Sequence, residues 1–238
     1  MFKNKRVIAV ITARGGSKGI PNKNLKSFSG KPLIFWTIKA ARESKYIDTI
    51  VLSTDSPKIA SVSKKYGVEA PFLRPEAISR DNSSSIDVLF HALKFFEHRN
   101  DNFDIVIQLQ PTSPLRRSQD IDKALELLLK KKAKAVISIN KAFVSPLWTN
   151  ILPPNGCMKD FLRPELINRN RQRLPEYFQL NGAVFLGFVE YVVRNNGFYG
   201  KHSYAYVMPR ERSIDIDDIL DFRLAEALLE NKASKSCK

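Results

Sequence analysis

The sequence predicts an α/β protein: a single three-layer α/β/α domain built around a mainly parallel sheet. Three observations lead to this prediction. Short apolar runs rich in β-branched residues, typical of strands buried on both faces, alternate with longer stretches whose apolar residues recur at helical spacing. Loops rich in glycine, proline and charge follow several of these runs. The 238 residues suffice for one sizeable core and are few for two, so we expect one domain over residues 1–238.

The first predicted strand, residues 7–11, leads directly into a glycine-rich, basic loop. Three of the eight residues after it are glycine, which lets the backbone approach a ligand closely. Arg14, Lys18 and Lys23 add three cations, so we expect a site for a polyanion at the carboxyl end of this strand. Neither the P-loop spacing nor the dinucleotide fingerprint is present. A solvated basic turn is the alternative.

Further strands and helices alternate along the rest of the chain. The later predicted strands are residues 50–53, 68–73, 105–109, 135–139, 182–187 and 204–208. The predicted helices are residues 32–42, 57–66, 86–96, 119–131 and 219–229. Ser56 and Ser84 precede two of the helices and are expected to cap them.

Two connecting segments are unusual. Residues 110–117 contain Pro111 and Pro114, which exclude a helix interior and a central strand, so a stiff loop follows the strand at 105–109. A stiff loop suits a preorganised site, although it is equally consistent with a structural turn. Residues 141–180 contain five prolines and no regular pattern, and a long irregular segment is usually functional or contacts a partner.

Near the end of the chain, Asp215 and Asp217 alternate with isoleucines. In an extended segment this spacing puts both carboxylates on one side and the isoleucines on the other. Paired carboxylates repel each other unless a cation lies between them, and Mg²⁺ is commonly held by one or two carboxylates plus substrate phosphates. The alternative is that Asp217 or Asp218 only caps the helix that follows.

Composition limits the possible functions. The excess of 39 basic over 24 acidic residues, a net charge of +15, suits either small anionic substrates or nucleic acid, but no nucleic-acid recognition motif is present. Cys157 and Cys237 have neither disulfide-framework nor zinc-site spacing. No apolar run approaches the ~20 residues of a membrane span, and the first one is too short for a signal peptide. We expect a cytoplasmic protein without a membrane partner.

Several motifs together resemble the acylneuraminate cytidylyltransferases, the CMP-sialic acid synthetase family. They are A-R-G-G-S-K-G-I-P-x-K-N at 13–24, L-R-P at 73–75, Q-P-T-S-P-L-R at 110–116, N-G-A at 181–183 and S-I-D-I-D at 213–217. The resemblance implies a Rossmann-like nucleotidyltransferase fold, a homodimer, and a role for residues 141–180 as a dimerisation and substrate arm. It implies that CMP is transferred from CTP to the anomeric hydroxyl of a nine-carbon 2-keto sugar acid, with Mg²⁺ and with release of pyrophosphate.

The resemblance also assigns roles to individual residues. The implied catalytic residues are Arg14, Lys18, Lys23 and Asp217, and the implied metal ligands are Asp215 and Asp217. The implied nucleotide-binding residues are Ala13, Arg14, Gly16, Ser17, Asn24, Arg74 and Ser85. The implied sugar-acid-binding residues are Gln110, Arg171, Asn181 and Phe185, with Arg171 serving the site of a neighbouring subunit.

Two departures from the family pattern concern the acceptor. Trp148 stands where members that activate N-acetylneuraminate have a lysine, and Gln179 stands where some have an arginine. A 5,7-diamino nonulosonate of the legionaminic or pseudaminic type therefore stays open beside N-acetylneuraminate. An eight-carbon acid is a less favoured acceptor, because the glycine-rich motif of this chain resembles that of the members that activate such an acid less. From another class, a basic nucleic-acid-binding protein is the remaining alternative.

Overall fold

The computed structural model of the chain describes residues 2–16, 19–80 and 83–236. Its centre is a six-stranded sheet with the strand order β4-β1-β5-β7-β6-β8. The strands are β1 (Val7–Thr12), β4 (Thr49–Ser53), β5 (Ile105–Leu109), β6 (Ala135–Lys141), β7 (Phe178–Phe188) and β8 (Ser203–Val207). Only β7 runs against its neighbours, so the predicted mainly parallel sheet is confirmed.

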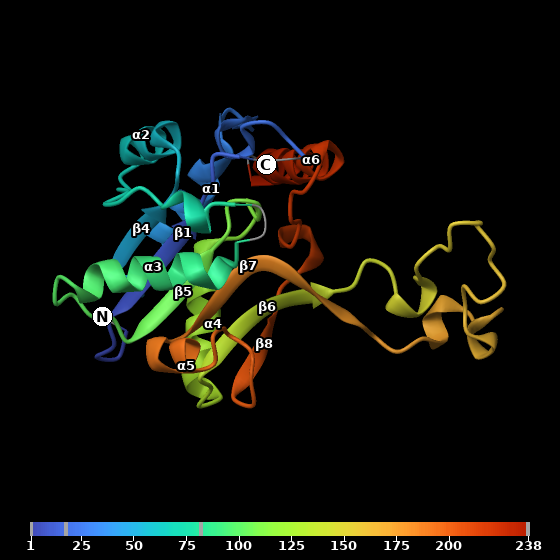
Figure 1. The fold of residues 1–238 in the computed structure, drawn as a ribbon. Coiled ribbons are helices and arrows are strands. Elements are labelled where there is room, and N and C mark those ends of the chain that lie inside the picture. Colours follow the sequence, from blue (N-terminus) through green and yellow to red (C-terminus); the bar gives the residue numbers. More distant parts are fainter. Residues whose placement is uncertain (1, 17–18, 81–82, 237–238) are drawn as a thin grey trace.

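Helices cover both faces of this sheet (Figure 1). They are α1 (Leu33–Arg42), α2 (Pro57–Lys65), α3 (Ser85–Glu97), α4 (Ser118–Lys130), α5 (Val189–Arg194) and α6 (Ile219–Ser236). Successive residues of β1 point to opposite faces: Ala9 packs in one core cluster with α1, α2 and α4, whereas Val10 packs in another with α3 and α5. Both side chains are fully buried, which gives the three layers that the apolar runs predict.

A third core cluster lies beyond the carboxyl ends of the strands. There α6 packs against a hairpin of β2 (Ser27–Phe28) and β3 (Lys31–Pro32), with the rings of Phe28 and Phe222 5.2 Å apart. The buried side chains of Ile214 and Ile216 belong to the same cluster. The last helix is therefore anchored to the first quarter of the chain, which brings the two predicted halves of the site together.

One predicted strand is absent. The backbone of residues 68–73 forms no ladder with the sheet edge; its contacts there are an isolated bridge between Leu73 and Thr54 and a bond from the N–H of Leu52 to the oxygen of Glu69. The reason is Pro71, which has no N–H to donate and so interrupts a ladder. Elsewhere β7 is longer than predicted, and the hairpin and the six-residue α5 were too short to give a periodic signal.

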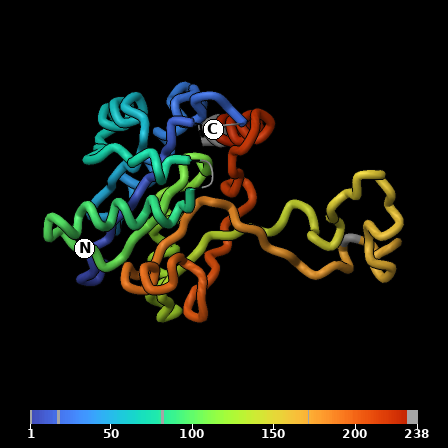
Figure 2. Tube along the Cα trace, in the orientation of Figure 1, coloured from blue at the N-terminus to red at the C-terminus, as the bar shows by residue number. Residues whose placement is uncertain are grey.

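The segment between β6 and β7 leaves the body of the protein as a long excursion, drawn in yellow and orange (Figure 2). Its described backbone forms only short 3-10 turns: η3 (Pro146–Trp148), η4 (Pro164–Leu166) and η5 (Arg171–Arg173). Its exposed large apolar side chains include Ile151, Leu152, Met158 and Ile167. We call residues 142–177 the arm. Among the helices of the described chain, none is long and apolar enough to cross a membrane.

Candidate active site

A cleft of about 330 Å³ opens at the carboxyl ends of β1 and β5. Its walls come from the glycine-rich loop, the segment before α3, the proline loop after β5, and the acidic segment before α6. The lining residues are Thr12, Arg14, Gly16, Lys23, Asn24, Arg74, Ile78, Arg80, Ser83, Ser85, Val88, Gln110, Pro111, Thr112, Asp215 and Asp217. Arg14 and Lys23 therefore face one cavity with Asp215 and Asp217, although the two pairs are about 200 residues apart in sequence.

The acidic segment is held against the first loop by direct contacts. Lys23 donates from Nζ to the backbone oxygen of Ile216 at 2.6 Å, and the N–H of Ile216 bonds to the oxygen of Thr112 at 2.8 Å. A Cβ on Gly19 would lie 2.3 Å from the backbone oxygen of Asp217, so only glycine fits at this approach. These contacts set the distance between the basic and acidic walls of the cleft.

The glycine-rich loop is itself supported from both sides. Asn24 donates from its side-chain amide to the backbone oxygen of Arg14 at 2.9 Å. On the other side, the N–H of Gly15 donates to a carboxylate oxygen of Asp55 at 2.7 Å. The sequence analysis did not identify Asp55 as a site residue. Its position could have indicated the role, because Asp55 follows the carboxyl end of β4 as Arg14 follows that of β1.

Arg74 places a buried positive charge beside the loop. Its side chain is 7% exposed and donates to both the hydroxyl and the backbone oxygen of Ser53, at 3.2 and 2.6 Å. Burial lowers the pKa of Arg74 to about 10, with Asp55 opposing this effect and Arg14 adding to it. Arg74 remains charged at neutral pH and is ready to meet an anionic ligand.

Asp215 has the features of a cation ligand. It is half-buried, and burial raises its pKa; Thr112 and Lys23 lower it, whereas the neighbouring charge of Asp217 raises it. Its Oδ1 atom is buried and has no hydrogen-bond partner among the described residues. A buried carboxylate oxygen without a partner is costly, and a divalent cation would satisfy it. The unpartnered Oδ1 of Asp215 therefore supports a metal site in the acidic segment, and this observation does not depend on the sequence pattern.

The number of carboxylates also matters. Within the part of the chain that the structure describes, no group of three or more His, Cys, Asp or Glu side chains could hold a metal ion. An ion held by Asp215 and Asp217 would therefore need further oxygens from a ligand or from water. Mg²⁺ is commonly bound in this way, through one or two carboxylates and the phosphates of a substrate.

The sequence offered Asp217 or Asp218 as the cap of α6, and the hydrogen bonds of the described residues decide between them. Asp218 does the capping: its Oδ1 accepts from the N–H groups of Leu220 and Asp221, at 2.8 and 3.0 Å. Asp217 uses its backbone N–H to bond to the carboxylate of Asp221 at 3.0 Å. Its own side chain is exposed and lines the cleft.

Not every predicted site residue lines the cleft. Asn181 is 1% exposed; its amide donates to the hydroxyl of Ser213 at 3.0 Å and accepts from that of Ser138 at 2.6 Å. It lies behind the cleft wall, so a supporting role fits it better than the contact with a sugar acid that the resemblance implies. Ala13 is likewise buried, and its N–H bonds to the oxygen of Ser53 at 3.0 Å.

The predictions for four further residues stay untested by this geometry. Phe185 is half-buried, does not line the cleft, and stacks at 5.8 Å on Phe198 in the core cluster under α3. Ser17 and Lys18 lie outside the described residues, as does the side chain of Arg171.

The proline loop is fixed from beneath by Arg116, which the sequence did not single out as a positioning residue. Its guanidinium is buried and donates to the backbone oxygens of Gln110 and Ala183, at 3.2 and 2.7 Å, and to the hydroxyl of Thr37 at 2.7 Å. Burial lowers the pKa of Arg116 to about 10. Because Arg116 is tied to three elements, it holds Gln110 at the cleft.

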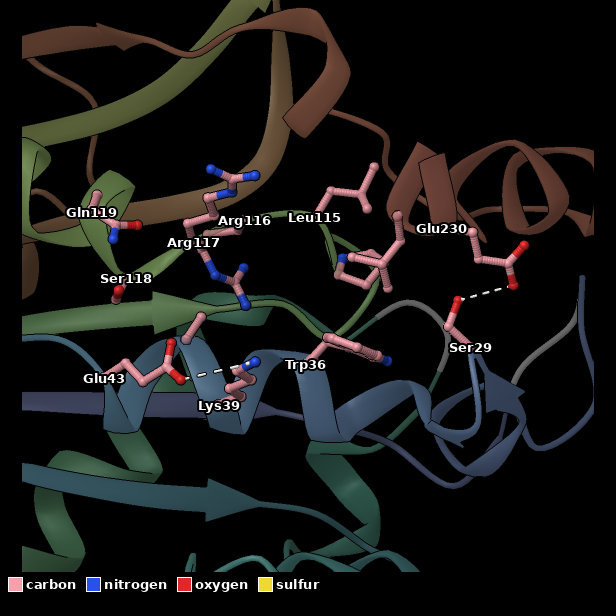
Figure 3. Close-up of a pocket in the computed structure, with 13 residues that line it drawn as sticks. Ser29, Trp36, Lys39, Glu43, Leu115, Arg116, Arg117, Ser118, Gln119 and Glu230 are labelled. Carbon is pink, nitrogen blue, oxygen red and sulfur yellow. Dashed lines mark hydrogen bonds and ion pairs between the residues drawn. The ribbon is translucent and has the colours of Figure 1, made fainter. Parts of the chain in front are cut away.

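A larger pocket, of about 620 Å³, lies on the far side of the same loop, between α1 and α6 (Figure 3). Trp36 and Leu115 form part of its wall, and Lys39 forms an ion pair with Glu43 at 4.0 Å on its lining. It contains none of the predicted site residues. The predicted site residues therefore gather in the smaller, strongly charged cleft and not in this larger pocket.

Gly182 gives a test of how tightly the cleft is packed. Its φ is +67°, and a Cβ there would lie 2.8 Å from Oε1 of Gln110 and 2.9 Å from Oδ2 of Asp215. The Gly182→Ala variant is expected to lose about 1–2 kcal/mol from backbone strain, or roughly 2–8 °C in Tm. Its kcat should fall at least about tenfold because two side chains of the cleft are displaced.

The matched control is Gly30→Ala. Gly30 has a similar φ of +76°, but nothing lies within 4 Å of a Cβ there. This variant should show a similar drop in Tm with unchanged kcat. Thermal melts and steady-state rates on both variants check the prediction, and equal kcat values for the two would contradict it.

The fold and the cleft together define a class of protein. A basic loop at the carboxyl ends of parallel strands, opposed by paired carboxylates, is suited to hold a nucleoside triphosphate and its metal ion. Comparison with known proteins assigns the family: the sequence model described as cytidylyltransferase matches residues 8–233, and the chain belongs to that family. It is a nucleotidyltransferase, and the family resemblance of its motifs is confirmed.

Two curated relatives are similar over nearly the whole chain. CMP-N,N'-diacetyllegionaminic acid synthase from Legionella pneumophila is 36% identical over 94% of this chain and 97% of its own length. N-acylneuraminate cytidylyltransferase from Escherichia coli is 34% identical over 95% of this chain. The chain spans about half of that enzyme, 53% of its length.

A solved structure confirms the fold. CMP:2-keto-3-deoxy-manno-octonic acid synthetase complexed with CTP superposes with a TM-score of 0.67, over 95% of this chain and 99% of that one. The two sequences are 17% identical, so this likeness concerns the fold alone.

Proposed function

We propose that this enzyme transfers CMP from CTP to the anomeric hydroxyl of a nine-carbon 2-keto sugar acid and releases pyrophosphate. The observation that carries the proposal is that Arg14 and Lys23 face Asp215 and Asp217 across one cleft. The donor and acceptor classes follow from the names of the relatives, which make CMP-diacetyllegionaminate or act on N-acylneuraminate. Because CTP is a cytoplasmic metabolite, we also propose that the reaction takes place in the cytoplasm.

The chemistry is a substitution at phosphorus. The anomeric hydroxyl of the acid releases its proton to solvent, its oxygen forms a bond to the α-phosphorus of CTP, the bond from that phosphorus to the bridging oxygen breaks, and pyrophosphate leaves. Negative charge grows on the phosphate oxygens during this step, so fixed cations stabilise the transition state more than the ground state. Arg14 and Lys23 are suited to this role, and Lys18 is proposed to share it.

The two carboxylates are proposed to bind the metal ion. Asp215 and Asp217 would hold Mg²⁺ on the phosphates, where a divalent cation neutralises charge and orients the triphosphate. The unpartnered Oδ1 of Asp215 supports this assignment. On the opposite wall, Arg74 and Ser85 line the cleft and are proposed to bind the nucleotide, with Ser85 toward the cytosine.

The arm is proposed to contact a second copy of the chain. Its exposed apolar side chains, Ile151 at 89% exposure among them, would be covered in a homodimer. Arg171, on the arm, is proposed to serve the neighbouring cleft. Trp148 lies on the arm and Gln179 at its base, where Oε1 accepts from the N–H of Phe143 at 3.3 Å. These two positions are proposed to tune which nine-carbon acid is accepted.

The test uses the purified full chain with CTP, Mg²⁺ and a panel of acids: N-acetylneuraminate, diacetyllegionaminate, pseudaminate and an eight-carbon 2-keto acid. We expect pyrophosphate release and a CMP-sugar product, identified by mass spectrometry, with at least one nine-carbon acid. Light scattering on the same sample should give a dimeric mass. No product with any nine-carbon acid, or tight oligonucleotide binding without CTP binding, would contradict the proposal; a monomeric mass would contradict the dimer.

A further inference from the structure

A buried ion pair lies behind the acidic wall of the cleft and is outside the reaction scheme above. Asp120, 1% exposed, accepts from Nε and NH2 of Arg212 at 3.0 and 2.7 Å, which is a bidentate arrangement. The same carboxylate accepts from the hydroxyl of Tyr206 at 3.2 Å and from the N–H of Arg117 at 3.0 Å. Four donors thus converge on one buried carboxylate.

The electrostatic state of the cluster agrees with this geometry. The hydrogen bonds from Arg212 to Asp120 raise the pKa of the guanidinium, so the pair is held in its charged form. Burial, together with the charge of Asp120, raises the pKa of Tyr206 to about 12, so its hydroxyl stays protonated and donates. The cluster is fully paired at neutral pH, and this favours one fixed geometry.

The pair joins the two segments that carry the cleft's ligands. Asp120 lies in the first turn of α4, directly after the proline loop whose Gln110 and Thr112 line the cleft. Arg212 ends the short turn η6 (Arg210–Arg212), and the acidic segment begins three residues later at Asp215. No strand or helix contains Asp215, so its position depends on how its flanking residues are held.

The acidic segment is joined to the proline loop by a second contact besides the ion pair. The N–H of Ile216 already bonds to the oxygen of Thr112 at 2.8 Å. With the pair of Asp120 and Arg212, the acidic segment is tied to the proline loop and its following helix at two separate points. Two such points restrain rotation of the segment, and therefore the direction in which its carboxylates face.

We propose that Asp120 and Arg212 are positioning residues that aim Asp215 and Asp217 at a divalent cation bound with CTP. This inference rests on the proposed function. Neither residue of the pair lines the cleft, so the pair acts through the acidic segment. Its loss should therefore weaken the help that Mg²⁺ gives to CTP binding, while the contacts of Arg14 and Arg74 with the nucleotide stay intact.

Arg212→Lys tests this, because lysine keeps the charge and lacks the two-pronged geometry. CTP binding is measured by calorimetry with Mg²⁺ and, separately, with EDTA. We expect affinity in EDTA to change less than about twofold, the gain in affinity on adding Mg²⁺ to shrink at least about tenfold, and half-saturation by Mg²⁺ to move upward by a similar factor. The KM for the sugar acid should be unchanged.

The matched control is Arg194→Lys, the same replacement in an exposed ion pair with Glu190 on α5. It should leave all of these quantities unchanged. If Arg212→Lys fails to fold, Tyr206→Phe removes one bond to Asp120 without unpairing the charge, and a smaller loss of the Mg²⁺-dependent gain is then expected. A gain equal to wild type in the variant that folds overturns the inference.

The two proposals fail separately. If the wild-type enzyme makes no CMP-sugar with any acid in the panel, the proposed function falls. If the wild-type enzyme is active and Arg212→Lys behaves like Arg194→Lys, only the positioning role is lost.

Discussion

The Asp217→Ala variant is expected to fold and to turn over at about one per cent of the wild-type rate or less. Its side chain is exposed, lines the cleft and caps no helix, so its removal leaves the core unchanged. What is lost is one of two carboxylates facing the proposed metal ion. Pyrophosphate release at saturating CTP and sugar acid, with a thermal melt of the same sample, measures both effects.

The neighbouring aspartate supplies the control. Asp218→Ala removes the cap of α6 and should cost about 1 kcal/mol, or roughly 2–4 °C in Tm, while kcat stays near wild type. The two variants should therefore differ in opposite ways: Asp217→Ala loses activity and keeps its stability, whereas Asp218→Ala loses stability and keeps its activity. Near-normal turnover in Asp217→Ala would remove this residue from the mechanism.

The Arg14→Ala variant is also expected to lose activity, with kcat lowered about 100-fold or more. Arg14 is half-buried at the start of the glycine-rich loop, and it lines the cleft beside Arg74. We propose that a fixed guanidinium there neutralises charge that grows on the triphosphate during transfer. Arg14→Lys keeps the charge without the planar fork and should recover part of the rate.

Arg42→Ala separates this local effect from the loss of one positive charge on the whole protein. Arg42 donates to the backbone oxygen of Tyr66 at 2.8 Å and does not line the cleft. Its replacement lowers the net charge by the same amount and should leave kcat near wild type. Similar rates for Arg14→Ala and Arg42→Ala would argue that general electrostatic steering, and not a local contact, governs turnover.

The elements predicted well are those with a strong local pattern. β1 and β5 are almost entirely apolar because both faces of the sheet are covered, and α1 and α4 carry apolar stripes. The failure at residues 68–73 has a local cause as well, since Pro71 cannot join a ladder. The early start of β7 has no local signal; it follows from pairing of residues 178–180 with the end of β6.

The sequence by itself determined the chemistry of the site: a glycine-rich basic loop after a buried strand, a stiff proline loop, and two aspartates in alternation. Those properties belong to residue types and their spacing, which no fold is needed to reveal. Only the tertiary structure decided which aspartate caps α6, and that Asp55, Arg116 and Asp120 support the cleft. The supporting roles of Asp55, Arg116 and Asp120 arise from hydrogen bonds between residues 40 to 92 positions apart, and sequence spacing carries no information about those partners.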